Sequence, residues 1–341
     1  MSSRSKKRNV TSIDVARRAG VSQTTVSFVL NSDNTPNIPD ETRQRVLDAV
    51  AELGYRPNAL AKGLRMKKSG IFGFITGQIA ITPYAGKIFE GAQDVAWENG
   101  KILILVNTKG KPELENRAID LLLSRQVEGI IYATMFHRPV HVPAALREFP
   151  LVLLDCFDEN QQMLSVVPDE HKGGYTATKY LLDKGHRRIG FINNIDDIPA
   201  TFGRLDGYKS ALAEAGIPYE SQLVYRDQSI QEGGYRGALH LLQQRNRPTA
   251  LFCFNDRMAM GAYDTIRKLN LQIPEDVAVM GFDNQELIAA HLYPPLTTME
   301  LPHYRMGSLA ARHLVEILSD TEHNHPMQHK IECRLVERES V

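Results

Sequence analysis

The chain has 341 residues, of which 43% are hydrophobic and 23% are charged. This composition excludes a disordered chain, and the length exceeds that of one ordinary core, which predicts two or three compact units. The formal net charge is zero, but the first 68 residues carry 13 Lys and Arg against 6 Asp and Glu, and the remainder 27 against 34. A basic segment at one end of a neutral chain indicates a nucleic-acid-binding module attached to an ordinary body.

The three cysteines, Cys156, Cys253 and Cys333, form no C-x-x-C pair, and two of them lie in apolar, strand-like runs. This usage favours buried free thiols in a reducing cytosol. The N-terminal residues are polar and basic with no apolar stretch after them, and no run reaches the length of a membrane span. The sequence therefore predicts a cytoplasmic protein that does not enter a membrane.

The first 56 residues show the pattern of three short helices. Thr11, with an acidic residue three positions later, predicts the start of a helix that Gly20 ends. Ser22 is placed to cap a second helix over residues 23–30, and a third helix ends at Gly54. Two short helices joined by a tight turn predict a small all-α helix-turn-helix headpiece, a common reader of DNA.

The start of the second helix carries short hydrogen-bonding side chains, Gln23, Thr24, Thr25 and Ser27. At the N-terminal end of a recognition helix such groups reach base edges and phosphates in the major groove. The alternative is that one or two of them cap the helix or face solvent.

Several blocks of this region occur in one order and spacing: VTSIDVA at 10–16, AGVS at 19–22, TVS at 25–27, ETR at 41–43 and YRPN at 55–58. Together they resemble the DNA reader of the lactose-repressor (LacI/GalR) family. The resemblance implies DNA contacts from Thr11, Ser22, Gln23, Thr24, Thr25, Ser27, Asn31, Arg43, Tyr55, Asn58, Ala61, Leu64 and Arg65. The chain departs from the family at Phe28, where an arginine is usual, so the half-site sequence stays open.

The resemblance also assigns residues 57–68 to a hinge. In the family, the segment that matches Asn58 to Arg65 becomes a helix only on the operator, where the side chain at the position of Leu64 enters the minor groove. An eight-residue helix is too short to persist alone. An inserted apolar side chain is an established means of kinking DNA.

Strand-like and helix-like segments alternate from residue 69 onward. The first series has strands expected at 71–76, 102–106, 129–132 and 151–154, with helices at 89–97, 114–123 and 143–147. The second has helices at 174–182, 207–215, 233–242 and 258–269 and strands at 188–192, 223–225, 250–254 and 277–280. The break at residues 155–169 predicts an α/β body of two doubly wound parallel-sheet lobes rather than one large sheet.

The expected domains follow from these segments. They are a helix-turn-helix domain at 1–56, a hinge at 57–68 and a two-lobed, periplasmic-binding-protein-like body at 69–341. We expect the first lobe at about 69–167 and 299–326, and the second lobe at about 168–298 and 327–341.

The body carries further blocks that resemble the family's sensor domain, among them GHRRI at 185–189, RLDGY at 204–208 and the segment 274–283. The resemblance implies a small-molecule site that includes Tyr84, Asp155, Arg204, Gln228, Asn255 and Asp283. Carboxylates, an amide and a guanidinium suit a polyhydroxylated ligand, which favours a sugar or sugar derivative. The alternative for Asn255 and Asp283 is that they cap loops at strand ends.

Two other classes of protein fit less well. The sequence has no Walker A, G-x-S-x-G or H-E-x-x-H motif, so no enzyme and no cofactor are predicted. His323, His325 and His329 lie in a polar stretch that favours a solvated loop over a metal site. A sugar-transport protein would share the lobes but leaves residues 10–65 unexplained.

The sequence thus predicts a ligand-controlled DNA-binding repressor. Helix-turn-helix readers of two-fold operators act as dimers. The chain stops just after Ser340 without a leucine heptad, so a homodimer is expected rather than a tetramer.

Overall fold

The computed structural model of the chain describes residues 10–31, 38–56, 69–77, 85–160, 162–319 and 326–341. The chain divides into two compact units, Met1–Ser69 and Gly70–Val341. In the described segments, no helix is long and apolar enough to span a bilayer.

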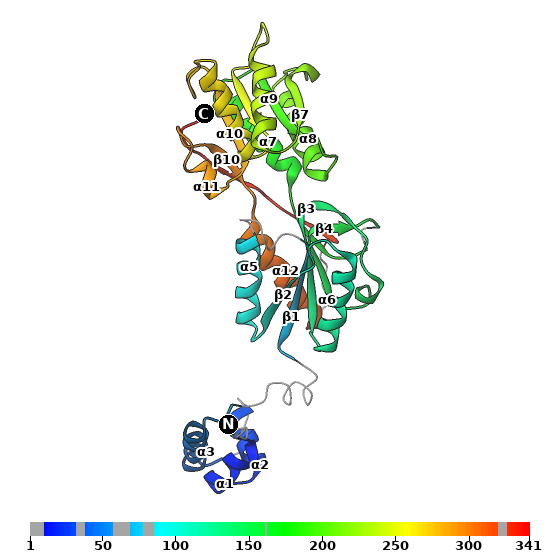
Figure 1. Cartoon of the computed structure of the whole chain (residues 1–341), viewed down its shortest axis with the longest axis vertical. Helices are drawn as coiled ribbons and strands as arrows, with labels where there is room; N and C mark the ends of the chain where they lie inside the picture. Colours follow the sequence, from blue (N-terminus) through cyan, green and yellow to red (C-terminus); the bar gives the residue numbers. More distant parts are fainter. Residues whose placement is uncertain (1–9, 32–37, 57–68, 78–84, 161, 320–325) are drawn as a thin grey trace, which may run out of the picture. The chain divides into compact units, whose positions relative to one another are not determined.

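The described residues of the first unit form three helices, α1 Ser12–Ala19, α2 Gln23–Asn31 and α3 Asp40–Leu53 (Figure 1). Thr11 and Asp14 form a reciprocal capping box at the start of α1, as the sequence predicts. Gly20 and Gly54 end α1 and α3 in the left-handed conformation, with φ of 68° and 61°. The three helices bury one small core of Val15, Ala16, Ala19, Val26, Val29, Val46 and Ala49.

The first lobe of the second unit contains a parallel sheet in the order β11-β5-β4-β3-β1-β2. Its strands are β1 Ile71–Thr76, β2 Ile102–Asn107, β3 Gly129–Val140, β4 Leu151–Asp158, β5 Ser165–Pro168 and β11 Gln328–Ile331. Its helices are α5 Ala85–Glu98, α6 Pro112–Ser124 and α12 His303–Leu318, with a 3-10 turn at Ala144–Leu146.

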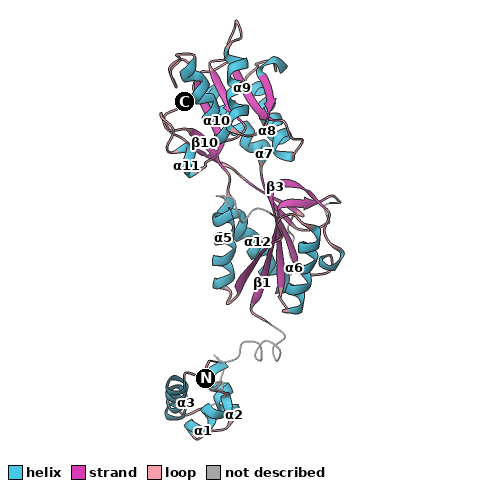
Figure 2. Cartoon of the chain, viewed as in Figure 1, coloured by secondary structure: helices cyan, strands magenta, loops and turns pink. Residues whose placement is uncertain are grey.

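Helices cover both faces of this sheet (Figure 2). Helices α5 and α12 lie side by side on one face, where Ile88 and Leu314 pack against Phe72 and Phe74. Helix α6 packs its Leu122 on the opposite face. Because β2 is the last strand in the order, one of its long edges has no neighbouring strand within the described residues.

The second lobe repeats the arrangement, with a sheet in the order β12-β10-β9-β8-β6-β7. Its strands are β6 Ile189–Asn194, β7 Val224–Asp227, β8 Ala250–Cys253, β9 Ala278–Asp283, β10 Thr297–Glu300 and β12 Arg334–Val336. Its helices are α7 Glu170–Asp183, α8 Pro199–Glu214, α9 Gln231–Leu242, α10 Asp256–Lys268 and the short α11 Glu286–Ala289, with a 3-10 turn at Ser221–Leu223. Strand β12 runs antiparallel to β10, whereas the other pairs in the described sheet are parallel.

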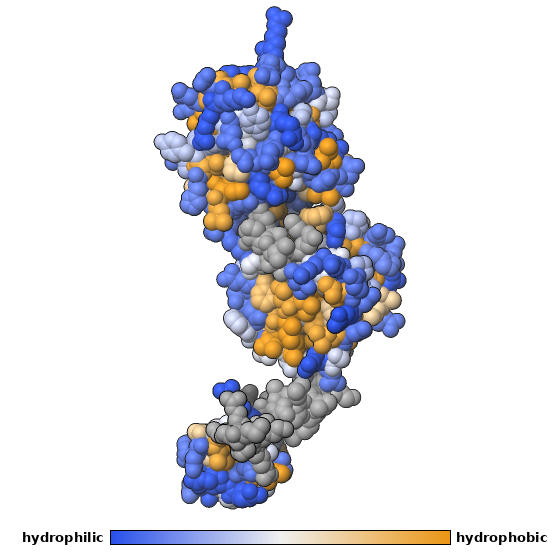
Figure 3. All heavy atoms as spheres, in the orientation of Figure 1, coloured by the Kyte–Doolittle hydropathy of each residue, from blue (hydrophilic) through white to orange (hydrophobic). Residues whose placement is uncertain are grey.

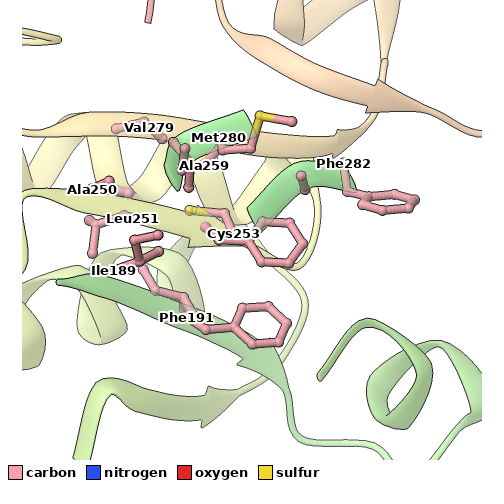
Figure 4. Packing of buried hydrophobic residues seen from close by; sticks show 14 of the residues in the cluster. Ile189, Phe191, Ala250, Leu251, Cys253, Ala259, Val279, Met280 and Phe282 are labelled. Carbon is pink, nitrogen blue, oxygen red and sulfur yellow. The ribbon is translucent and has the colours of Figure 1, made fainter. Parts of the chain in front are cut away.

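The core of the second lobe is built on aromatic side chains from adjacent strands. The rings of Phe191 and Phe252 stack with centroids 4.5 Å apart, and Phe282 lies beside them (Figure 4). Cys253 packs in the same core (Figure 4). All three cysteines are free and buried, which confirms that part of the sequence prediction.

Two expected lobe boundaries and one expected helix differ from the structure. Strand β10 stays in the second sheet to Glu300, and β11 stays in the first sheet to Ile331, so the chain crosses between the lobes slightly later than expected. These ends are set by pairing with strands distant in sequence, for which the local pattern has no signal. The expected helix at 143–147 is only the 3-10 turn at Ala144–Leu146, because so short a segment does not repay helix nucleation.

Helices α7 and α8 approach so closely that a glycine is required at their contact. A Cβ on Gly207 would lie 2.2 Å from the backbone oxygen of His171 and 2.4 Å from the backbone nitrogen of Tyr175. We therefore expect Gly207→Ala to lower the free energy of unfolding by about 1–3 kcal/mol in chemical denaturation.

Gly86→Ala in α5 is the matched control, because a Cβ there has no described atom within 4 Å. It should stabilise the helix by up to about 1 kcal/mol. Equal effects of the two substitutions would contradict the steric explanation.

Candidate functional site

Arg204 in α8 is the centre of a buried charged cluster, and its side chain is only 3% exposed. Its Nε donates to Glu170 Oε2 at 2.7 Å, and one terminal nitrogen donates to the backbone oxygen of Phe254 at 2.5 Å. The guanidinium lies over the rings of Phe282 and Phe254, at 3.6 and 4.4 Å from their centroids. These contacts fix the plane of the guanidinium and face it toward the end of β9.

Two aspartates predicted from the sequence belong to this cluster. Asp283 Oδ1, at the end of β9, lies 3.9 Å from the Arg204 guanidinium. Burial raises the pKa of Asp283 to about 6, although Arg204 acts in the opposite direction. Asp155, inside β4, is buried, and its pKa is raised well above the usual value by burial and by the charge of Glu170. The structure therefore brings Asp155, Arg204 and Asp283 together.

Asn255 and Gln228 have different positions. Asn255 follows β8 and caps helix α10, since its side-chain oxygen accepts from the Met258 backbone nitrogen at 2.9 Å. Its amide nitrogen donates to the Ser229 backbone oxygen at 3.1 Å, which ties it to the loop after β7. The structure thus confirms the capping alternative for Asn255. These two bonds use the side-chain oxygen and one of the two N–H groups of its amide. Gln228 lies in the same loop and is exposed.

The sequence reasoning missed two residues of the cluster, Glu170 and His137. Glu170 is the first residue of α7, and its side chain is 6% exposed. An acidic residue in the first turn is common in helices, so nothing in the sequence indicates that this one belongs to the cluster. His137 in β3 is also buried, and both ring nitrogens have no hydrogen-bond partner in the described part of the chain. Burial lowers the pKa of His137. The nearby charge of Glu170 acts to raise this pKa, and that of Arg204 acts to lower it.

Asp256, also missed, holds the loop that carries Asp283. Its carboxylate accepts from Thr298 Oγ1 on β10 and from the Gln285 backbone nitrogen, both at 2.6 Å. The Gln285 side chain in turn donates to Asp283 Oδ2 at 3.2 Å. Asp283 has a φ of 104°, so the loop leaves β9 in a conformation that needs this support.

In the headpiece, several candidate DNA contacts also stabilise the turn. Ser22 Oγ accepts from the Thr25 backbone nitrogen at 3.0 Å and lies 2.9 Å from the Thr25 hydroxyl. Gln23 donates to the Ser12 hydroxyl at 2.9 Å, so it connects the starts of α1 and α2. Together with the cap at Thr11, these bonds fix the N-terminal end of α2.

The remaining headpiece candidates differ in exposure. Thr24 and Phe28 are exposed on α2, whereas Ser27, Arg43 and Tyr55 are half-buried. Helix α2 ends at Asn31. Asn58, Ala61, Leu64, Arg65 and Tyr84 lie outside the described residues.

The histidine cluster expected in a loop is only partly described. His329 lies in strand β11, with its ring centroid 5.5 Å from that of His313, so the loop assignment is wrong for this residue. Pairing with β5 places it in the sheet. His323 and His325 lie outside the described residues, and no group of three or more metal-ligating side chains occurs within the described ranges.

A helix-turn-helix headpiece followed by a two-lobed body with a buried polar cluster defines a DNA-binding transcription regulator with a ligand-binding domain. Residues 12–58 match the model of bacterial regulatory proteins of the lacI family, and residues 178–341 match a periplasmic binding protein-like domain. The chain is 37% identical over 331 residues to the HTH-type transcriptional regulator RegA of Clostridium saccharobutylicum, covering 96% of this chain and 98% of the relative. It belongs to the lacI family.

Two solved structures agree with this assignment along nearly the whole chain. The complex of the transcriptional regulator CelR with cellobiose is 30% identical with a TM-score of 0.68, covering 98% of this chain and 100% of that one. The Lac repressor dimer bound to operator and the anti-inducer ONPF is 26% identical with a TM-score of 0.80, covering 98% and 99%. The expected fold, a headpiece with two parallel-sheet lobes, is confirmed.

The buried position of Asp256 generates a prediction on pH. Burial, together with the charge of Asp283, raises the pKa of Asp256 to about 8 in the folded chain, against an ordinary value of 3.8. Between these values the folded state binds a proton that the unfolded state has released, so the free energy of unfolding falls as pH rises. Asp256→Asn, which resembles the protonated acid, should flatten this dependence in urea denaturation at pH 5 and pH 8.

Asp206→Asn is a suitable control, because that side chain on α8 is 63% exposed. It should leave the pH dependence as in the parent chain. A parental slope in Asp256→Asn would contradict the assignment of the effect to Asp256.

Proposed function

We propose that this chain is an operator-binding repressor whose affinity for DNA is controlled by a small polar ligand, a sugar or sugar derivative. The observation that carries the proposal is the convergence of buried polar groups at the carboxyl ends of strands. Asp155 lies inside β4, at the irregularity in its pairing with β3, while Asn255 follows β8 and Asp283 ends β9 beside Arg204. Ligands of doubly wound sheets bind at such ends.

The chemistry of these groups supports a polyhydroxylated ligand. Aspartates accept hydrogen bonds from hydroxyls, and Arg204 donates to ring or hydroxyl oxygens. CelR, which shares the fold and 30% of its sequence with this chain, is described in complex with cellobiose. We include Gln228 and Tyr84 in the proposed site on the strength of the family resemblance alone.

The headpiece supplies the proposed DNA contacts. Gln23 and Thr24 are exposed at the N-terminal end of α2, the end that enters the major groove in helix-turn-helix readers. We assign base and phosphate contacts there to these two residues with Thr25 and Ser27, and further DNA contacts to Thr11, Ser22, Asn31, Arg43, Tyr55, Asn58, Ala61, Leu64 and Arg65. In this proposal, ligand changes the angle between the lobes and so the spacing of paired hinges on DNA.

We further propose that the acting species is a homodimer formed at the free edge of the first sheet. Ile102 on β2 and Leu121 on α6 are 52% and 50% exposed, and Figure 3 shows hydrophobic residues gathered on this lobe. The hollow beside them is lined by apolar Val106 and Leu114 together with Arg117 and Asp120, among others. A face with both charge signs can complement its own copy across a two-fold axis. The structurally similar Lac repressor is described as a dimer on operator.

Asp283→Asn tests the ligand site. Asparagine tolerates the positive φ of this position and keeps an acceptor for Gln285, but it removes the carboxylate beside Arg204. Loss of a charge-assisted hydrogen bond costs about 1.5–3 kcal/mol, so the affinity for a sugar that stabilises the parent should fall about tenfold or more. A thermal-shift panel of monosaccharides and disaccharides, followed by calorimetry, measures this.

Operator affinity without sugar should be unchanged in Asp283→Asn. Glu220→Gln is the control, because this carboxylate pairs with Arg188 rather than with Arg204. Equal sugar affinities in the parent and in Asp283→Asn would move the ligand site elsewhere.

Leu64→Ala tests the DNA-binding role separately. If the Leu64 side chain enters the minor groove, its truncation should weaken operator binding severely. The reason is that no apolar side chain would then fill the space between the unstacked bases. Gel-shift titration on an operator selected from random duplexes measures this, and Leu287→Ala, at an exposed position of the body, serves as the control. Unchanged Kd in Leu64→Ala would contradict the hinge assignment, whereas the thermal stability of the body should not change.

A further inference from the structure

We propose that Glu170 makes the ligand site selective against anions, so that the ligand is an uncharged polyhydroxylated molecule rather than a phosphorylated or carboxylated one. This inference rests on the proposed function, because it names the ligand class of the same site. It depends on the partners that Arg204 already has within the protein.

The positive charge of Arg204 is balanced inside the protein. Glu170 Oε2 accepts from Nε at 2.7 Å, with the two side chains only 3% and 6% exposed, and Asp283 lies 3.9 Å from a terminal nitrogen. Among the residues that the structure describes, Arg204 is the one buried Arg or Lys side chain. An anionic ligand would therefore meet a guanidinium that two carboxylates surround.

The balance holds in either protonation state of the neighbouring acids. With Asp155 and Asp283 protonated, the pair of Glu170 and Arg204 is neutral, and with both aspartates ionised the cluster has an excess of negative charge. In neither state do these buried groups carry a net positive charge, and the cations Arg257 and Lys330, which act on Asp283 and His137, are exposed. A desolvated anion placed against such a group of residues has no compensating charge, which makes its burial unfavourable.

Arg204 also cannot turn away from Glu170 to meet a ligand anion. Its guanidinium lies over the ring of Phe282 on one side and close to that of Phe254, with a terminal nitrogen bonded to the Phe254 backbone oxygen. Moving the group would break this bond and the buried ion pair together. The remaining N–H groups can donate to a neutral oxygen without any rearrangement.

His137 supplies the second observation that points to a ligand. Its ring is 9% exposed and stands edge-on to Phe157, with centroids 5.4 Å apart. Neither ring nitrogen has a hydrogen-bond partner among the described residues. The charged groups that affect the pKa of His137 are Glu170 and Arg204 in the second lobe and the exposed Lys330 on β11. A neutral imidazole has one donor and one acceptor, which match a hydroxyl group. We assign His137 to a ligand hydroxyl.

The first experiment needs no identified ligand and uses inorganic phosphate as the probe. The full chain is titrated with phosphate against chloride at equal ionic strength, with thermal unfolding and calorimetry as readouts. The parent should show no phosphate-specific shift. Glu170→Gln keeps the acceptor for Arg204 Nε but removes the charge, and should gain phosphate affinity by about tenfold or more.

Two further variants assign the effect. Glu220→Gln removes a carboxylate from another arginine pair of the same lobe, that with Arg188, and should gain nothing. The double variant Glu170→Gln with Arg204→Met should lose the gain, since the buried guanidinium that Glu170 no longer balances is absent. Phosphate-specific binding by the parent that Arg204→Met removes, or no gain in Glu170→Gln while the variant keeps its fold, would overturn the proposal.

The second experiment compares matched sugars, such as glucose with glucose 6-phosphate and ribose with ribose 5-phosphate. The parent should respond only to uncharged members of the panel, and His137→Phe should lower the affinity for a responding sugar by about tenfold. Equal binding of both members of a pair at a site that Asp283→Asn abolishes would refute charge selection but support the proposed site. Sugar binding that neither Asp283→Asn nor His137→Phe affects would refute the proposed site itself.

Discussion

The buried ion pair between Arg204 and Glu170 holds together the end of the second lobe where the buried polar side chains lie. Two charges at 3% and 6% exposure are stable only when they satisfy each other and the surrounding polar groups. The pair joins the start of α7 to the middle of α8, and through Phe254 and Asp283 it reaches the ends of β8 and β9. Four elements are thereby held at one end of the sheet. The geometry of the candidate site follows from that constraint.

Close packing around the pair makes this end rigid. The chain at Gly174 approaches Arg204 so closely that a Cβ would lie 2.3 Å from its backbone oxygen. Asp256 ties β10 and the loop after β9 to the start of α10. Polar groups in such surroundings cannot adapt to an arbitrary ligand, and so the proposed site would discriminate by which hydrogen bonds and charges it leaves unpaired. Among the described residues, the polar groups without a partner include His137, whereas the Arg204 guanidinium already donates to Glu170.

The headpiece follows a different principle. Its core of seven buried side chains is small, and its turn is held by side-chain hydrogen bonds of Thr11, Ser22 and Gln23. The residues that fix the turn are the same short polar residues that are candidates for contact with DNA. In the proposed reader, capping and recognition are therefore combined in few positions, because so short a helix exposes few side chains at its N-terminal end.

The sequence by itself determined the elements and the family. Caps at Thr11, Gly20 and Gly54, the alternating strand and helix pattern, and the motif that contains Arg204 and Gly207 all act within a few residues, so they can be found locally. The tertiary structure alone decided which groups meet. Glu170 and Arg204 are 34 positions apart, and Asp256 and Thr298 are 42 apart. His137 carries no local signal at all. Such pairings depend on how strands and helices pack, which no pattern within a single segment encodes.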